Sequence, residues 1–174
     1  MNLQELNNKF CRLSSIIFCV FSLISCTKGS DKVIITYEVK EYKDSSFFIN
    51  FTINNTSSIK LNSPWSLHWN QQSSLIDEKS VPENVIYDYV AGQYYSILTF
   101  GKDYILPKDS ILSIDLSQRG IVRRQSDLPV GGFIVSNDQI LDVEFNYIWK
   151  NAKGIQKLNA PSSVDRYKEY ISNS

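Results

Sequence analysis

Hydrophobic and polar residues alternate along several short stretches of the chain. In FFINFTI (47–53), the apolar odd-numbered positions fall on one side of an extended strand, and Asn50 and Thr52 fall on the other. The same period of two residues recurs in VIITYEV (33–39) and in ILDVEFNYIW (140–149). This period is typical of β-strands that bury one face, so each of these stretches is predicted to be a strand.

Shorter apolar runs predict further strands at WSLHW (65–69), SILTF (96–100), ILSIDL (111–116) and GGFIV (131–135). Clusters of Asn, Ser, Gly, Pro and Asp separate the runs and indicate turns, and no stretch keeps a helical period. We therefore predict an all-β fold, an immunoglobulin-like antiparallel β-sandwich over residues 33–150. Residues 151–174 lose the alternation and are predicted to be a short polar C-terminal linker or tail.

The stretch PWSLHW holds two of the three tryptophans of the chain. Spaced tryptophans serve either as a platform for sugar rings or as the packed interior of a sandwich. On a strand, Trp65, Leu67 and Trp69 share one face, and His68 points the opposite way, toward solvent or a sheet edge. Because an apolar row offers a sugar no polar partners beside its rings, the pattern favours a core position.

The N-terminus carries a different pattern, a weakly basic start with Lys9 and Arg12 followed by the apolar run SSIIFCVFSLIS. This run is shorter than the ~20 residues that span a bilayer as a helix. It ends in LISC, which resembles the lipobox of bacterial lipoproteins. The pattern predicts a signal peptide over 1–25 and a lipidated Cys26 at the start of a tether that ends at residue 32. A simple signal peptide and an uncleaved anchor are the alternatives.

The lipoprotein prediction places the chain in the bacterial cell envelope, held by lipid in the outer membrane or at the cell surface rather than in the inner membrane. It also accounts for all 3 cysteines. Cys11 and Cys19 fall in the signal peptide and Cys26 carries the lipid, so the mature domain is expected to fold without disulfides around an ordinary apolar core.

Charge and residue chemistry exclude several function classes. The chain has 18 Lys and Arg against 18 Asp and Glu, without a basic stripe, which argues against nucleic-acid binding. With His68 as the only histidine, a zinc site of His and Cys ligands is excluded, and no cofactor is expected. No G-x-S-x-G motif is present. Asp142 and Glu144 are expected on a solvated strand face, and Asp127 is expected to bond backbone amides in a turn.

Four motifs follow one another along the chain: Asn54–Asn55, the W-x-(aliphatic)-x-aromatic strand at 65–69, Gly92, and SDLPVGGFIV at 126–135. This order resembles the N-terminal domain of bacterial family 20 β-N-acetylhexosaminidases and chitobiases, over most of residues 33–149. The resemblance implies an immunoglobulin-like sandwich associated with carbohydrate binding. The family's catalytic barrel, with its Asp–Glu pair, has no counterpart in the sequence, so its enzyme activity is not carried over.

The resemblance and the composition together predict a membrane-anchored carbohydrate-binding or accessory module without catalysis of its own. Its expected partners are glycans that contain N-acetylhexosamine, or a glycan-processing enzyme. The candidate binding residues are four tyrosines that crowd a poorly alternating segment around Gly92: Tyr87, Tyr89, Tyr94 and Tyr95. The alternatives are a structural or protein-interaction module and a truncated remnant of a split β-N-acetylhexosaminidase.

Overall fold

The computed structural model describes residues 32–90, 92–151 and 154–160, which form ten strands and two short 3-10 helices. The strands are β1 (Lys32–Lys43), β2 (Ser46–Asn54), β3 (Trp65–Asn70), β4 (Ser74–Ile76), β5 (Val85–Val90), β6 (Tyr95–Phe100), β7 (Ile111–Gly120), β8 (Val130–Ser136), β9 (Gln139–Asn151) and β10 (Gly154–Ala160). The helices are η1 (Glu78–Ser80) and η2 (Gln125–Asp127). Within these ranges no helix is long and apolar enough to cross a membrane. Cys26 and the predicted signal peptide lie outside the described residues.

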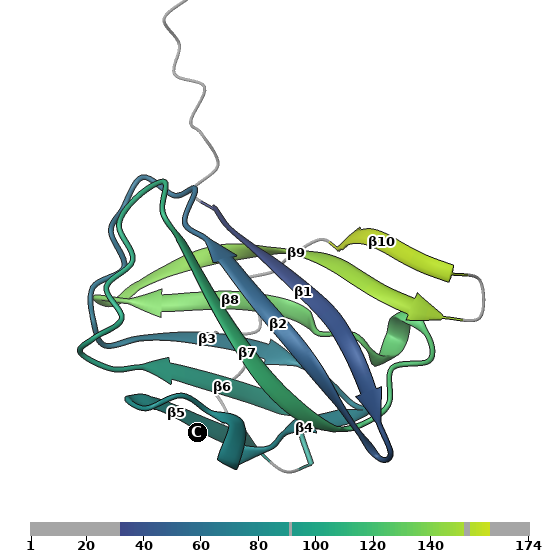
Figure 1. Cartoon of the computed structure of the whole chain (residues 1–174). Helices are drawn as coiled ribbons and strands as arrows, with labels where there is room; N and C mark the ends of the chain where they lie inside the picture. Colours follow the sequence, from purple (N-terminus) through teal and green to yellow (C-terminus); the bar gives the residue numbers. More distant parts are fainter. Residues whose placement is uncertain (1–31, 91, 152–153, 161–174) are drawn as a thin grey trace, which may run out of the picture.

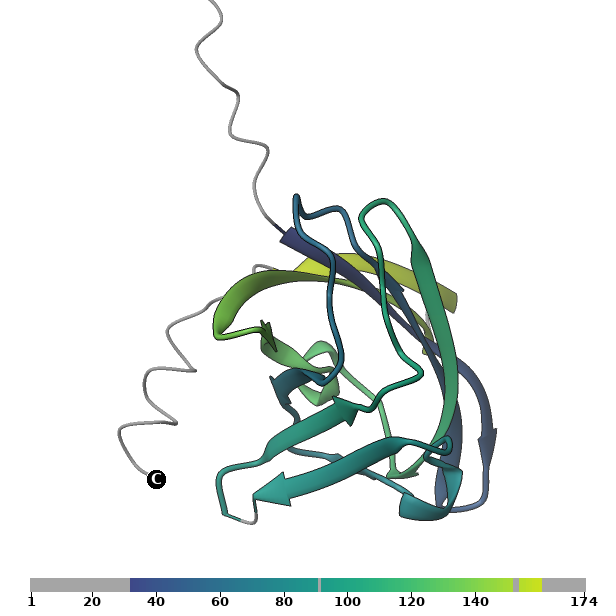
Figure 2. The same ribbon diagram turned by 90° about the vertical axis from the view of Figure 1, so that its left-hand side faces the viewer.

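The strands form two layers that share the long strand β9. One layer has the order β4-β7-β2-β1 and the other the order β8-β3-β6-β5, and β9 pairs with both β1 and β8. Figure 1 shows β7, β2 and β1 crossing in front of β8, β3 and β6, and Figure 2 shows the layers from the side. The predicted all-β sandwich is confirmed.

One strand pair departs from the predicted antiparallel arrangement. β1 runs parallel to β9, whereas every other pair of described strands is antiparallel. β1 and β9 lie near opposite ends of the domain sequence, so no tight hairpin joins them. A long connection leaves the relative direction of two strands free, which a two-residue turn does not.

The alternating positions that were predicted to face inward are buried. They come from β1, β2, β3 and β9 and form one core between the layers: Val33, Ile35, Tyr37, Val39, Phe47, Ile49, Phe51, Ile53, Trp65, Leu67, Trp69, Leu141, Val143, Phe145, Tyr147 and Trp149. Burial of such side chains stabilises the fold by about 25 cal/mol per Å² of apolar area.

The tryptophans of PWSLHW belong to this core, as predicted. The Trp65 ring stacks on Phe100, with centroids 4.0 Å apart and planes 12° apart. Its indole N–H donates to the carbonyl oxygen of Tyr104 at 2.6 Å, so burial leaves no unpaired donor. Trp69 packs against Phe51 across the two layers, with centroids 5.5 Å apart.

The prediction that His68 points toward solvent or a sheet edge is wrong. His68 lies on the face of β3 opposite the tryptophans, but β3 is flanked by β8 and β6, and the imidazole is buried. The Phe133 ring stacks on it at 4.6 Å and 11°. Nδ1 lies 2.8 Å from the Tyr95 hydroxyl and Nε2 lies 2.7 Å from the Ser66 hydroxyl. Aromatic neighbours from both adjacent strands therefore cover the outer face of β3 here.

Three segments that were not predicted to be strands pair with neighbours. Residues 74–76 form β4, an antiparallel partner of β7. In the poorly alternating, tyrosine-rich segment before Gly92, residues 85–90 form β5, an antiparallel partner of β6. Within the range predicted to be a polar linker or tail, β9 continues to Asn151 and β10 pairs antiparallel with it. Residues 161–174 of that range lie outside the described residues.

Candidate functional site

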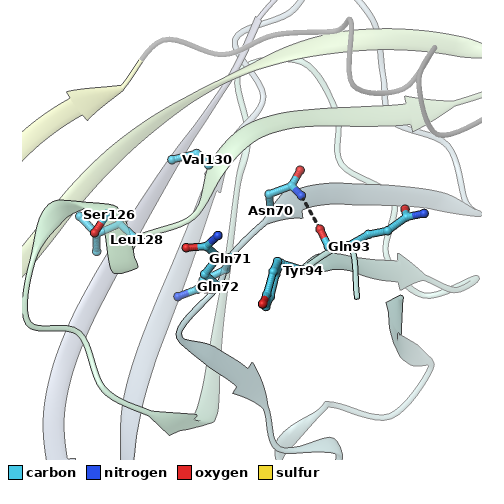
Figure 3. Close-up of a pocket in the computed structure, with 8 residues that line it drawn as sticks. All are labelled: Asn70, Gln71, Gln72, Gln93, Tyr94, Ser126, Leu128 and Val130. Atoms are coloured by element: carbon cyan, nitrogen blue, oxygen red, sulfur yellow. Dashed lines mark hydrogen bonds between the residues drawn. The ribbon is translucent and has the colours of Figure 1, made fainter. Parts of the chain in front are cut away.

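A hollow of about 400 Å³ opens where β3 ends, and we call it the amide hollow. Its lining comes from the β3–β4 connection, the β5–β6 hairpin and the η2–β8 segment: Asn70, Gln71, Gln72, Gln93, Tyr94, Ser126, Leu128 and Val130. Figure 3 shows these residues arranged around the opening. The lining combines four amides, a serine hydroxyl, a tyrosine phenol and two aliphatic side chains, and none of these side chains is charged.

Gln71 is buried and forms the fixed part of this lining. Its Nε2 donates to the backbone carbonyl of Asp127 at 3.1 Å and to the Tyr37 hydroxyl at 3.3 Å. Its Oε1 accepts from Gln118 Nε2 at 3.2 Å and from the Trp69 indole at 3.4 Å. Because these bonds occupy the amide from both ends, Gln71 joins the hollow rigidly to the core.

The phenol of Tyr37 lies beneath the hollow within the same polar cluster. Burial raises the pKa of Tyr37 far above its ordinary value, and the hydrogen bond with Gln71 only partly opposes this shift. The hydroxyl donates to Gln118 Oε1 at 2.5 Å. Tyr37 therefore stays a neutral phenol at any physiological pH and acts as a structural group of the cluster.

The η2 turn forms another wall, and Asp127 holds it as predicted. Its Oδ2 accepts from the backbone N–H of Arg123 at 2.9 Å and of Arg124 at 3.1 Å. This pairing satisfies a carboxylate that is 8% exposed. The turn places Ser126 and Leu128 on the lining, Ser126 exposed and Leu128 buried.

Tyr94 presents the only aromatic ring of the amide hollow, and its backbone is unusual. Its φ is 54°, in the left-handed region that bulky side chains rarely adopt. Its carbonyl oxygen accepts from the backbone N–H of Gln71 at 2.8 Å, which ties the hairpin to the end of β3. The side chain is 44% exposed, so the ring is accessible while the backbone is fixed.

Several polar groups of the lining have no hydrogen-bond partner in the described part of the chain. Gln72 and Ser126 are exposed, and neither side chain has a hydrogen bond to the described residues. Asn70 Nδ2 donates to the carbonyl of Gln93 at 3.0 Å, drawn as a dashed line in Figure 3, while its Oδ1 has no partner in the described part of the chain. Figure 3 also shows the Gln93 amide extending away from the other lining side chains.

Another hollow, about 380 Å³ in volume, lies between β4 and β5, the two end strands of the sheet path, and we call it the edge hollow. It is lined by Leu75, Ile76, Glu78, Tyr87, Asp88, Tyr89 and Arg119. The hydroxyl of Tyr87 lies 3.3 Å from that of Ser96, and burial raises the pKa of Tyr87. Arg119 Nη2 lies 3.3 Å from Asp77 Oδ1, so its charge is already paired.

The four predicted tyrosines do not form one cluster. Tyr94 lines the amide hollow, Tyr87 and Tyr89 line the edge hollow, and Tyr95 lines neither. Tyr95 is 3% exposed and its hydroxyl contacts His68, so we leave it out of the site. Gln71 and Gln72, the amides of the β3–β4 connection, were not among the predicted site residues. Their signal was the run NQQ directly after the tryptophan strand.

The described residues include one polar cluster with a histidine, the Ser66–His68–Tyr95 chain of hydrogen bonds. In the described ranges, no group of three or more His, Cys, Asp or Glu side chains is placed to hold a metal ion. Burial lowers the pKa of His68 to about 4, which makes its imidazole a weak base at neutral pH. The hydrogen bond between His68 and Tyr95 joins β3 to β6 on the outer face of β3.

Comparison with known proteins finds no matching family model and no matching curated protein. Among solved structures, the family 20 exo-β-N-acetylglucosaminidase of Vibrio harveyi in complex with N-acetylglucosamine matches with a TM-score of 0.51 at 18% identity. An inactive mutant of that enzyme matches with a TM-score of 0.50 at 17% identity. The chitin-binding domain of Chi18aC from Streptomyces coelicolor gives a TM-score of 0.44 at 12% identity, over 61% of this chain and 92% of that one.

The match to the Vibrio harveyi enzyme covers 75% of this chain but only 18% of the enzyme. This chain therefore spans less than a fifth of the length of that relative. At this level of identity the likeness shows a shared fold, the β-sandwich that the strand pattern predicts.

Proposed function

We propose that this chain is a carbohydrate-binding or accessory module without catalysis of its own, and that it binds glycan at the amide hollow. The observation that carries the proposal is the exposed ring of Tyr94, held in a left-handed backbone conformation at the edge of an uncharged, amide-rich hollow. Non-glycine residues with this backbone cluster at ligand-binding sites, where the strain is compensated by the surrounding contacts.

The chemistry of the amide hollow suits a neutral sugar. A pyranose presents an apolar face of C–H groups, which packs on an aromatic ring, and a rim of hydroxyls, which need both donors and acceptors. Tyr94 supplies the ring, and the amide of Gln72 and the hydroxyl of Ser126 each supply a donor and an acceptor. A site with few polar groups beside an apolar wall is typical of small-molecule recognition.

The fold likeness and the sequence resemblance support the glycan class. The Vibrio harveyi enzyme that shares the fold is described in complex with N-acetylglucosamine. The motif order of this chain resembles the N-terminal domain of such enzymes. We therefore include glycans that contain N-acetylhexosamine, or an enzyme that processes them, among the proposed partners.

Titration of the full-length chain with chitin oligosaccharides and mucin-type glycans, on an array and by calorimetry, tests the proposal. Tyr94→Ala should weaken binding at least tenfold, about 1.4 kcal/mol, whereas Tyr94→Phe should keep most of it. Phe48→Ala is the matched control, because Phe48 is 43% exposed against 44% for Tyr94 but lies on β2. Absence of binding at millimolar glycan, or binding unchanged by Tyr94→Ala, contradicts the proposal.

The envelope location is a separate part of the proposal and rests on the sequence alone. The motif LISC before Thr27 supports lipidation at Cys26 and attachment to the outer membrane or the cell surface. Cells that express Cys26→Ala should lose incorporation of labelled palmitate and should release the protein from the membrane fraction. A membrane-bound Cys26→Ala protein would contradict the lipid anchor and leave the glycan site untouched.

A further inference from the structure

The amide hollow and the edge hollow share two segments of chain in their linings. The β3–β4 segment supplies Gln72 to the amide hollow and Leu75 to the edge hollow. The β5–β6 hairpin supplies Tyr94 to the amide hollow and Tyr89 to the edge hollow. Each hollow therefore contains at least one tyrosine from the hairpin and at least one residue from the β3–β4 segment.

Chain geometry limits how far apart the two hollows can lie. Gln72 and Leu75 are three residues apart, and an extended chain spans at most about 3.6 Å per residue, so their backbones lie within about 11 Å. Ser73 fixes this link, because its hydroxyl donates to the carbonyl oxygen of Asp127 at 3.1 Å. The two hollows are thus neighbours at one end of the sandwich.

The rings of the edge hollow are suited to extend the amide hollow. Tyr87 and Tyr89 are two residues apart on β5, so their side chains project from the same face of that strand. Both are only partly buried. A single sugar needs one ring to pack on, whereas a chain of sugars needs several in sequence. The edge hollow also carries the uncharged apolar surface of Leu75, which is 40% exposed.

We infer that the two hollows are adjacent subsites for one oligosaccharide, so that the ligand is a chain of several sugar units rather than a mono- or disaccharide. This inference rests on the proposed glycan binding at the amide hollow. One sugar unit packs on Tyr94, and units further along the chain reach Tyr89 in the edge hollow. Once the first unit is bound, the next contact is intramolecular, so a longer glycan gains affinity without a stronger contact at either subsite.

The test uses the full-length chain and N-acetylchitooligosaccharides of increasing length from the disaccharide to the hexasaccharide. We expect the dissociation constant to fall at least about tenfold over this series. Tyr89→Ala should remove that gain and leave disaccharide affinity within about twofold, since it leaves the amide hollow intact. Ile86→Ala is the control, because Ile86 is an exposed residue of β5 that does not line the hollow.

Backbone amide shifts in the nuclear magnetic resonance spectrum of the unsubstituted protein give a second measurement that does not depend on a variant folding. The hexasaccharide should shift the signals of both Gln72 and Tyr89, and the disaccharide only that of Gln72. Equal affinity for both lengths, or hexasaccharide shifts confined to the amide hollow, would overturn the inference while leaving the proposed function in place. Absence of binding at every length would overturn both.

Discussion

Strand β3 and the β5–β6 hairpin both carry aromatic residues, but they place them differently. The tryptophans of β3 alternate with polar residues and are buried in the core. In the hairpin, Tyr87 and Tyr89 lie on β5, the end strand of the sheet, and both are only partly buried. Tyr94 lies in the turn that precedes β6, where it is exposed and has a left-handed backbone. The difference shows that the place of an aromatic residue in the sheet decides whether its ring is buried in the core or exposed to solvent.

Of the substitutions that test this comparison, Trp65→Ala should change stability the most. It removes a fully buried ring that stacks on Phe100, and should lower the free energy of unfolding by roughly 3–5 kcal/mol. Urea unfolding followed by circular dichroism measures this loss. A Trp65→Ala protein of normal stability that no longer binds glycan would reverse the roles assigned to β3 and the hairpin.

The next largest change in stability is expected in acid, because His68 is buried on the outer face of β3. Burial lowers the pKa of His68 in the folded protein to about 4, below the ordinary value of 6.5. As the pH falls, the imidazole is therefore protonated in the unfolded chain before it is protonated in the folded protein. Stability from the neutral imidazole is present above pH 6.5 and is lost as the pH falls toward 4, by up to about 3 kcal/mol.

Urea unfolding at several pH values between 7 and 4 measures this loss, and His68→Gln serves as the control. The variant keeps the carboxylates that also titrate in this range but lacks the imidazole. Its stability should therefore fall less steeply with acid than that of the unsubstituted protein. Parallel pH profiles for the two proteins would show that His68 titrates normally and that the outer face of β3 is open to water.

Gly132→Ala tests how tightly β8 approaches β9. A Cβ at this position would lie 2.4 Å from Phe145 Cε2 and 3.1 Å from Val143 Cγ1, too close for either side chain to stay in place. Such overpacking should cost about 1–3 kcal/mol in thermal or urea unfolding. Gly92→Ala is the comparison, because Gly92 has no atom within 4 Å of a new Cβ and only its φ of 86° opposes alanine. A smaller loss for Gly132→Ala than for Gly92→Ala would contradict the close approach.

Tyr94→Asn should have the smallest effect on stability. It separates a packing role of Tyr94 from a binding role, because only the second predicts that binding is lost while stability is kept. Asparagine tolerates the left-handed conformation better than tyrosine, so the variant should be as stable as the unsubstituted protein or more stable by up to about 1 kcal/mol. Glycan binding should be lost with the ring. A clear loss of stability on urea unfolding would mean that Tyr94 is retained for packing and not for a ligand.

The sequence predicted the core because burial in a sandwich repeats every second residue. The stripes of β1, β2 and β9 and the row Trp65, Leu67 and Trp69 could all be read from that period. The turn at Asp127 was also predictable, since its carboxylate bonds backbone amides close to it in sequence. Such features depend on local geometry and on one buried face.

The sequence could not predict features that depend on strands meeting across the fold. His68 is buried because β8 and β6 bring Phe133 and Tyr95 against it, and the parallel pairing of β1 with β9 joins opposite ends of the domain.

The amide hollow likewise combines Gln72, Tyr94 and Ser126, which belong to three separate segments. The sequence by itself determined which faces of the strands are apolar and, from these, the all-β sandwich. Only the tertiary structure decided which polar groups converge, because contacts between distant segments depend on the register and packing of every strand between them.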